Sequence, residues 1–188
     1  MLQLVDTPAT LMARVATGDA RAFTMLVGEL YGPGLRVATR VAGDRGEAED
    51  ALQTALTRVW TEAARFDPAK GTVGGWFRRI VVNACLDRRR RLRLVAPLEA
   101  AAAVPSDLPD PFASAAANAR ARRVDAAMAH LNTRQRAAIT LFHGEGATMA
   151  EVAAALDTTP KAVEGLLARA RIDLSRMLAS DRPETRDR

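Results

Sequence analysis

Residues 148–171 read TMAEVAAALDTTPKAVEGLLARAR, and their pattern carries the strongest local signal for a fold. Thr148 to Leu156 has the apolar spacing of a short amphipathic helix, and residues 157–159 form a turn. Thr159 and Pro160 then supply the N-cap and the first position of a longer helix. Three apolar side chains fill the predicted angle between the two helices: Leu156, Val163 and Leu167. The pattern predicts a helix-turn-helix, with a plain helical hairpin as the alternative.

The composition of the 188 residues favours a helical protein with an anionic partner. Hydrophobic residues make up 48% and charged residues 26%, whereas aromatic residues make up only 4%. Ala, Leu, Arg and Glu outweigh the β-branched residues and Tyr, so we expect an all-α fold. The net charge of +5 indicates a polyanionic partner, with nucleic acid and an anionic membrane surface as the two alternatives.

Cysteine usage and apolar content indicate the compartment. The single cysteine, Cys85, excludes an internal disulfide framework and a zinc site built on several thiolates, which is typical of a reducing compartment. No run of consecutive apolar residues is long enough to span a bilayer, and Met1–Thr10 lacks the pattern of a secretory signal. We therefore expect a cytoplasmic protein without membrane insertion.

Proline positions predict two small helical domains rather than one continuous core. Four prolines lie among Ala, Ser and Asp in residues 93–118, which predicts a Pro/Ala-rich linker because proline fixes extended backbone and removes donors. The expected domains are residues 1–92 and 119–180, the second with the helix-turn-helix. Residues 181–188 are polar apart from one proline, and we expect a disordered tail.

Caps and apolar spacing predict helices in the first half. Thr7-Pro8 is typical of a helix start, and Gly18-Asp19 of a stop followed by a new cap. The run Gly32-Pro33-Gly34 predicts an interruption between two short helices. A continuous apolar stripe from Glu47 to Phe66, which includes Trp60, predicts one long amphipathic helix.

The next helix, beginning near Val73, carries the most informative polar face. At four-residue spacing its side chains form one row, extended by further arginines. The row consists of Arg79, Asn83, Asp87 and Arg91, and the extension of Arg78, Arg88, Arg89, Arg90 and Arg93. Such a run is either a solvated face or a phosphate-binding surface, and the nearby Trp76 and Phe77 favour binding of unstacked bases. We expect one of these two aromatic residues to pack in the core.

The order and spacing of five short segments resemble one protein family over nearly the whole chain. The segments are Asp19–Phe23, Ala48–Gln53, Phe66–Asn83, Leu131–Arg136 and Ala162–Arg171. Together they resemble the extracytoplasmic-function (ECF) sigma factors, which are two-domain alternative initiation subunits of bacterial RNA polymerase. The resemblance implies a protein that binds core RNA polymerase and promoter DNA, recognises a minus-ten and a minus-thirty-five element, and assists strand opening.

The resemblance also implies which residues bind the polymerase. The helix surface from Glu49 to Leu56 would dock on a coiled coil of the polymerase clamp. The implied contacts are Asp50, Leu52, Gln53 and Leu56. The family often has an aromatic residue where this chain has Leu56.

Two further sets of residues are implied to bind DNA. The minus-ten set would capture a flipped base of the non-template strand and hold the strand's phosphates. It comprises Lys70, Gly71, Thr72, Trp76, Arg78, Arg79, Asn83, Asp87, Arg88, Arg90 and Arg91. The minus-thirty-five set belongs to the helix-turn-helix, whose second helix would enter the major groove. It comprises Arg134, Arg136, Thr158, Thr159, Lys161, Glu164, Arg169 and Arg171.

Other classes of function predict different partners. By resemblance we expect an anti-sigma factor as a further partner. The alternatives are a helix-turn-helix regulator that acts without polymerase and a sigma-like decoy that binds only an anti-sigma factor. We expect no enzyme, no cofactor, no metal and no catalytic residue, because His130 and His143 are the only imidazoles and no phosphate loop or paired carboxylates occur.

Overall fold

The computed structural model describes residues 6–95 and 115–180, and every long element in them is an α-helix, as the sequence predicts. The first half contains α1 (Pro8–Ala16), α2 (Ala20–Ala42), α3 (Arg45–Glu62) and α4 (Val73–Val95). The second half contains α5 (Ala115–Ala129), α6 (Thr133–Ile139), α7 (Met149–Ala155) and α8 (Pro160–Ser180). Short 3₁₀ turns at Ala63–Arg65 and Pro68–Lys70 join α3 to α4, and a π-helical turn, Thr140–Gly144, follows α6. None of the helices in these ranges has the length and apolar content needed to cross a membrane.

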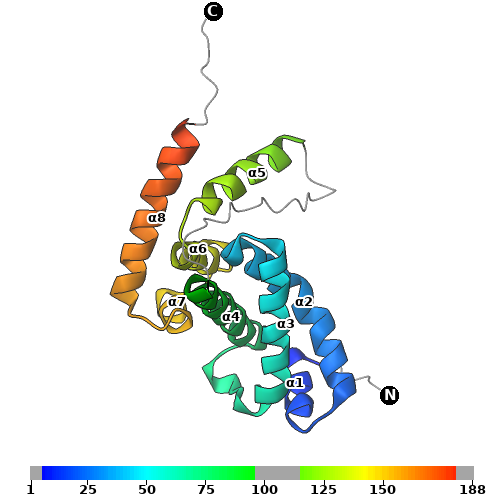
Figure 1. The fold of residues 1–188 in the computed structure, drawn as a ribbon. Helices are drawn as coiled ribbons and strands as arrows, with labels where there is room; N and C mark the ends of the chain where they lie inside the picture. The colour runs from blue at the N-terminus through cyan, green and yellow to red at the C-terminus, as the bar shows by residue number, and fades with distance from the viewer. Residues whose placement is uncertain (1–5, 96–114, 181–188) are drawn as a thin grey trace, which may run out of the picture.

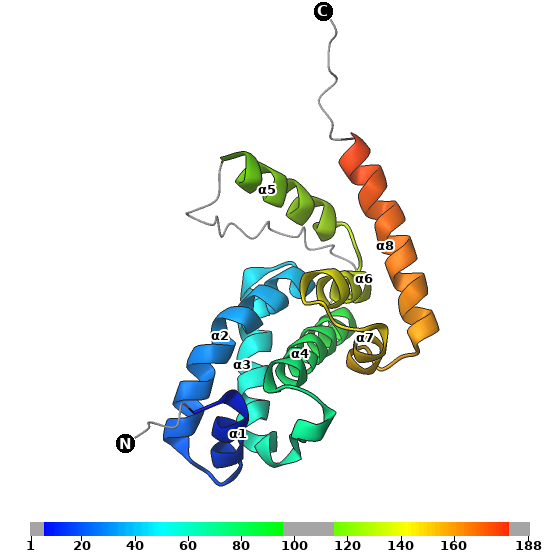
Figure 2. The ribbon, with the colours of Figure 1, turned by 180° about the vertical axis from the view of Figure 1, so that it is seen from behind.

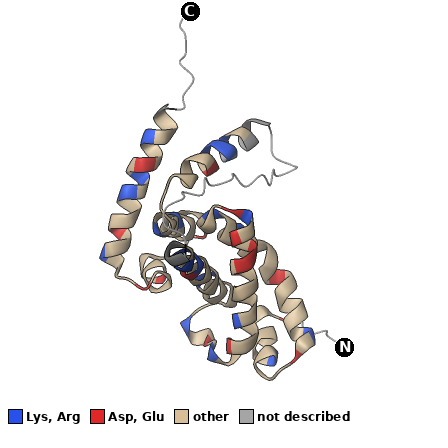
Figure 3. Ribbon diagram, viewed as in Figure 1, with Lys and Arg blue, Asp and Glu red and all other residues tan. Residues whose placement is uncertain are grey.

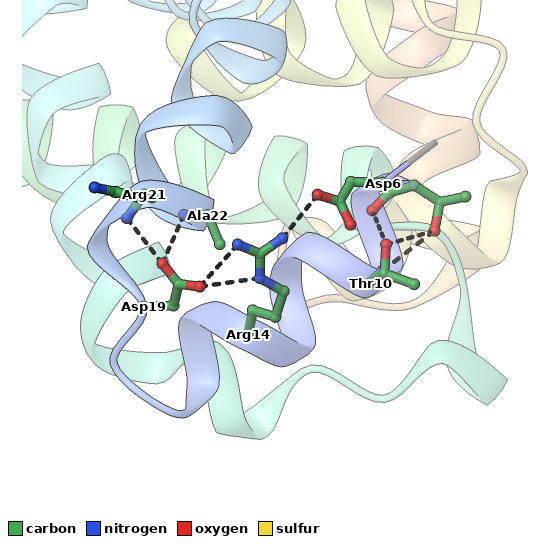
Figure 4. A network of polar contacts seen from close by, with 7 residues as sticks. Asp6, Thr10, Arg14, Asp19, Arg21 and Ala22 are labelled. Atoms are coloured by element: carbon green, nitrogen blue, oxygen red, sulfur yellow. Dashed lines mark hydrogen bonds and ion pairs between the residues drawn. The ribbon is translucent and has the colours of Figure 1, made fainter. Parts of the chain in front are cut away.

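Helices α1 and α2 begin at the caps that the sequence predicts. Thr7 caps α1 with Pro8 at its first position, and the Asp19 carboxylate caps α2 by accepting from the Arg21 and Ala22 backbone N–H groups. The Arg14 guanidinium joins the two helices, because it lies 2.7 Å from the Asp6 carboxylate and 2.9 Å from that of Asp19 (Figure 4). The hydrogen bonds from the Ala22 backbone N–H and from the Arg14 guanidinium lower the pKa of Asp19.

The expected break at residues 32–34 is wrong, because α2 runs through it as one helix with Pro33 inside. Packing on both sides overrides the local preference for an interruption, since Leu30 and Val37 are both buried in the core. Gly34 is needed for close packing of two helices rather than for a turn. A Cβ at this position would lie 2.6 Å from a ring carbon of Phe77 on α4, so only glycine permits this approach of the helices.

The helix-turn-helix forms as predicted. Thr148 and Glu151 make a reciprocal capping box at the start of α7, and the Thr159 hydroxyl accepts from the Ala162 backbone N–H at the start of α8. The connecting turn contains Asp157 in the left-handed region, at a φ of 48°. The three apolar residues that the sequence assigns to the angle are buried: Leu156, Val163 and Leu167.

The two halves pack directly on one another. Helix α4 lies between α2 and α3 on one side and α6 and α7 on the other, with α8 outermost (Figures 1 and 2). Buried residues of both halves therefore form one continuous apolar cluster, whereas the prolines suggested separated cores. The helices also extend into the expected linker at both ends, since α4 reaches Val95 and α5 begins at Ala115. Residues 96–114 and the expected tail 181–188 lie outside the described residues.

Candidate functional site

An apolar groove runs between α2 and α3 and is open to solvent. Its lining consists of Phe23, Val27, Tyr31, Glu49, Leu52, Gln53, Leu56, Thr57 and Trp60. Trp60 is 38% exposed and meets Phe23 edge to face, with ring centroids 5.1 Å apart. Three of the four implied polymerase contacts, Leu52, Gln53 and Leu56, line this groove. An exposed aromatic surface of this kind is typical of protein interfaces.

The fourth implied polymerase contact, Asp50, forms an ion pair beside the groove. Its carboxylate lies 2.6 Å from the guanidinium of Arg88 on α4. Arg89 similarly lies 3.9 Å from Glu47, and Asp87 pairs with Arg58 at 3.6 Å. The acidic residues on α3 (Figure 3) thus neutralise part of the arginine row that the sequence assigns to phosphates.

Three further arginines of the row face solvent, whereas the side chain of Arg93 lies outside the described residues. Arg79 and Arg91 are exposed, and neither forms an ion pair with any residue that the structure describes. Arg90 is also exposed, and among the described residues it pairs with Asp87 on its own helix, at 2.9 Å. Exposed pairs of this kind contribute little to stability, so Arg90 is available to a phosphate.

A cavity of about 380 Å³ collects most of the minus-ten set. Its wall on the first half includes Lys70, Gly71, Thr72, Trp76, Arg78 and Arg79. Trp76 is half-buried and meets Phe66 edge to face at 5.8 Å, whereas Phe77 is 1% exposed, so one of the two aromatic residues is core, as expected. Asn83 lies one helical turn after Arg79 on α4. It is half-buried and does not line this cavity.

The opposite wall of the cavity comes from the second half and is partly acidic. Glu145 and Glu151 line it, and the Glu145 carboxylate lies 3.6 Å from the Arg78 guanidinium. Hydrogen bonds from Thr148 and, less strongly, the charge of Arg78 lower the pKa of Glu151. The Glu151 carboxylate is therefore ionised at neutral pH, and both carboxylates lie opposite the basic wall.

Most of the minus-thirty-five set lies on accessible surface. Lys161, Glu164, Arg169 and Arg171 are exposed along α8, where charged residues recur along the ribbon (Figure 3). Thr159 is exposed at the start of this helix and Thr158 is half-buried in the turn before it. Arg134 is exposed but donates to the Leu156 carbonyl at 2.7 Å.

Arg136 differs from the rest of its set, because it is buried rather than available to DNA. It is 6% exposed, and its guanidinium donates to the carbonyls of Val41 and Ala42 at 2.9 Å each. It also donates to the carbonyls of Ala129 and Leu131, at 3.2 and 3.1 Å. Burial lowers the pKa of this guanidinium. In this arrangement Arg136 joins the two halves and has no side open to a nucleic acid.

Sequence reasoning missed the residues that depend on contacts between distant helices. Phe23, Tyr31 and Trp60 have ordinary helical spacing, and only the meeting of α2 and α3 makes them one surface. The available signal was the width of the apolar arc, since a stripe that includes both Leu56 and Trp60 is wider than one buried contact needs. No local pattern indicates that Glu145 opposes Arg78.

Family models match both halves of the chain. The Sigma-70 region 2 model matches residues 26–95, and the Sigma-70 region 4 model matches residues 121–174. The chain is 34% identical to the RNA polymerase sigma factor CnrH of Cupriavidus metallidurans, over 94% of this chain and 96% of that protein. It is 35% identical to the ECF RNA polymerase sigma factor SigM of Mycobacterium tuberculosis, over 90% of this chain and 84% of that protein.

Solved structures show the same arrangement of helices. A structure of CnrH in complex with the cytosolic domain of CnrY matches with a TM-score of 0.63 and 30% identity, over 93% of this chain and 99% of that chain. The sigma factor RpoE from Bartonella quintana, in complex with the anti-sigma factor NepR, matches in fold with a TM-score of 0.65 and 20% identity, over 87% of this chain and all of that chain. The chain belongs to the family of ECF RNA polymerase sigma factors.

Proposed function

We propose that this protein binds core RNA polymerase and directs it to promoters that carry a minus-ten and a minus-thirty-five element. Residues 1–92 bind the polymerase and open the minus-ten element, residues 93–118 link the halves, and residues 119–180 read the minus-thirty-five element. It acts in the cytoplasm, where its partners are, and performs no catalysis of its own. The observation that carries the proposal is the pairing of an open aromatic groove with two separate basic surfaces on one chain.

The groove between α2 and α3 is the polymerase-docking surface of this proposal. Trp60 and Tyr31 are large exposed side chains, and burial of such aromatic residues supplies much of the binding energy at protein interfaces. Trp60 lies one helical turn after Leu56 in the same groove, so it supplies the aromatic contact that the family often has at position 56. Gln53 and Asp50 add polar contacts at its edge.

The strand-capture surface consists of Lys70–Thr72, Trp76 and the solvent-facing side of α4. Trp76 offers a ring on which an unstacked base can stack, and the amide of Asn83 can bond the exposed edge of a base. Arg78, Arg79, Arg90 and Arg91 would hold the phosphates of the strand. Arg88 is held by Asp50, so its contribution to phosphate binding requires that this pair separate.

The helix-turn-helix reads the second element through α8. Its exposed N-terminal residues are those that enter the major groove in this motif. Lys161, Glu164 and Arg169 are the candidates for base or phosphate contacts, with Arg171 for phosphate. We further propose an anti-sigma factor as a regulatory partner, because RpoE, which has the same fold as this chain, forms a complex with the anti-sigma factor NepR.

Transcription in vitro on a fragmented genomic library tests this function. Core polymerase with the wild-type chain should initiate at a shared two-element promoter. The double variant Asn83→Ala, Arg79→Ala should still bind core polymerase but lose promoter opening, because base and phosphate contacts are removed together. A chain that binds duplex DNA without redirecting polymerase would instead be an ordinary helix-turn-helix regulator.

A further inference from the structure

A histidine and an arginine that are distant in sequence meet beside α8. The Arg171 guanidinium on α8 lies 3.3 Å from Nε2 of His143, which belongs to the π-helical turn Thr140–Gly144. Both side chains are exposed. An arginine side chain has donors and no acceptor, so the guanidinium donates and the imidazole nitrogen accepts. An accepting Nε2 requires a neutral ring with its proton on Nδ1.

The His143 ring is presented by a packed turn. It meets Phe142 edge to face with ring centroids 4.9 Å apart, and Phe142 packs against the apolar core. The turn itself is in contact with α2, α6 and α7. π-helical turns are rare and occur frequently at functional sites. The imidazole is therefore held near Arg171 by the fold around it.

No carboxylate among the described residues forms an ion pair with His143 or Arg171. The carboxylates that follow the turn, or that lie on α7 and next to Arg171 on α8, are bound by other groups. They are Glu145, which pairs with Arg78, Glu151, which accepts from Thr148, and Asp173, which accepts from Gln135. The pair therefore has no neutralising partner in this part of the chain.

The other charged groups on the elements that pack against the turn are basic. The Arg40 guanidinium on α2 lies against the turn, since a Cβ on Gly144 would lie 3.4 Å from it. On α6, Arg134 and Arg136 donate to backbone carbonyls. The surroundings of the pair thus carry an excess of positive charge, which an anion would balance.

Arg171 lies on a face of α8 that the proposed function directs toward DNA. Residues seven positions apart share a helix face, so Arg171 lies on the face of Glu164, about 10 Å further along the helix. In a helix-turn-helix the N-terminal residues of the second helix reach the base edges. The major groove is only about 12 Å wide, so a residue three turns along the helix lies near the phosphates that border the groove.

We propose that His143 and Arg171 together bind one backbone phosphate of duplex DNA. The phosphate replaces the hydrogen bond between them: Arg171 donates to one oxygen, while Nε2 of His143 takes up a proton from solvent and donates it to another oxygen. Two cations this close repel one another without an anion between them, so the proton and the phosphate bind together. This inference rests on the proposed function, because it adds a contact to the same helix-turn-helix.

The pH dependence of DNA binding tests the pair. Fluorescence anisotropy measures binding of the full chain to a short fluorescein-labelled duplex of mixed sequence, because phosphate contacts need no particular sequence. Histidine ordinarily changes charge between pH 5 and 8, so wild type should bind about 5-fold more tightly at pH 6 than at pH 8. His143→Gln should lose this gain and bind nearly equally at the two pH values.

The matched control is His130→Gln. His130 is the other imidazole of the chain, and it is exposed just after α5. This variant should keep the wild-type gain at pH 6. The comparison separates His143 from the general increase in positive charge at lower pH, since both variants remove one imidazole.

Arg171→Gln supplies a second, independent variant. It should weaken binding at both pH values and also abolish the gain at pH 6, and adding His143→Gln should cause no further loss, because both side chains hold one phosphate. Circular dichroism checks that each variant is folded.

The proposal is overturned where His143→Gln keeps the gain at pH 6, or where it weakens binding equally at both pH values, as a residue that only orients Arg171 would. It is also overturned where the losses of the two single variants simply add. The assay contains neither polymerase nor promoter. The proposed function fails separately, where wild type with core polymerase gives no promoter-specific transcription.

Discussion

The two candidate binding surfaces of the first half differ in chemistry and in accessibility. The groove of α2 and α3 is aromatic and open, whereas the side of α4 that carries Trp76 and Arg78 is basic and faces the second half. Both surfaces rest on α2, α3 and α4, and each of these helices packs against the other two. Two surfaces on the same packed helices can therefore differ in accessibility, because the second half packs against only one of them.

Substitution of Trp60 in the groove between α2 and α3 should have the strongest effect on binding. Trp60→Ala should weaken binding to core polymerase by about 2 kcal/mol or more, about 30-fold, because aromatic side chains at the centre of an interface dominate its energy. The free energy of unfolding should fall as well, because most of Trp60 is buried and its ring packs edge to face on Phe23, so binding is compared under conditions where both proteins are folded. Binding is measured by fluorescence anisotropy with labelled factor.

Met25→Ala is the matched control, since Met25 is 50% exposed on α2 and does not line the groove. It should bind polymerase as wild type does. Equal losses in Trp60→Ala and Met25→Ala would remove the distinction between the groove and the rest of the exposed apolar surface.

The second prediction concerns Gly34, where α2 packs closely against α3 and α4 beneath both surfaces. Gly34→Ala should lower the free energy of unfolding by about 1–3 kcal/mol, because the new Cβ would lie 2.6 Å from Phe77 and 2.8 Å from Leu52, both buried. Leu52 lines the groove and Phe77 belongs to α4, so polymerase binding and strand binding should both weaken. Urea unfolding and anisotropy assays of polymerase and strand binding measure this.

Gly28→Ala controls for the general effect of alanine in α2. No atom lies within 4 Å of its added Cβ, so it should stabilise the protein by about 0.5–1 kcal/mol through helix propensity. If Gly34→Ala stabilised to the same extent, α2 and α4 would not be in the close contact described.

The helices could be predicted from sequence because their signals are local. Thr7-Pro8, Asp19 and Thr159-Pro160 mark helix starts through bonds to backbone groups within three residues, and the structure confirms each. The break expected at Pro33 was wrong because Leu30 and Val37, on either side of it, are buried in a core built from helices distant in sequence. The local preference for a break is overridden where buried residues on both sides stabilise a continuous helix.

The candidate sites were predicted in part, for the same reason. Lys70, Trp76 and Arg78 are close in sequence, and the structure brings them to one cavity. Arginines at other positions look alike in sequence, yet Arg88 lies against Asp50 and Arg136 is buried among carbonyls of both halves. An arginine's partner depends on which helices meet, and one sequence does not specify this locally.

The buried side of α4 gives a smaller and pH-dependent effect. Cys85 lies there with its sulfur 3.9 Å from the Ala38 carbonyl of α2, and burial raises the pKa of its thiol to about 12. The folded-state pKa exceeds the value of about 8.5 in an unfolded chain, so this contribution to stability is present below pH 8.5 and is lost as the pH rises toward 12. Between pH 8 and 9.5 the free energy of unfolding of wild type should fall by about 1 kcal/mol more than that of Cys85→Ala, as measured by urea unfolding.

The native thiol should also react slowly with a disulfide reagent at pH 8. Rapid labelling without denaturant would mean that water reaches the contact between α2 and α4. In that case α2 and α4 would not be in the close contact that the buried Cys85 indicates.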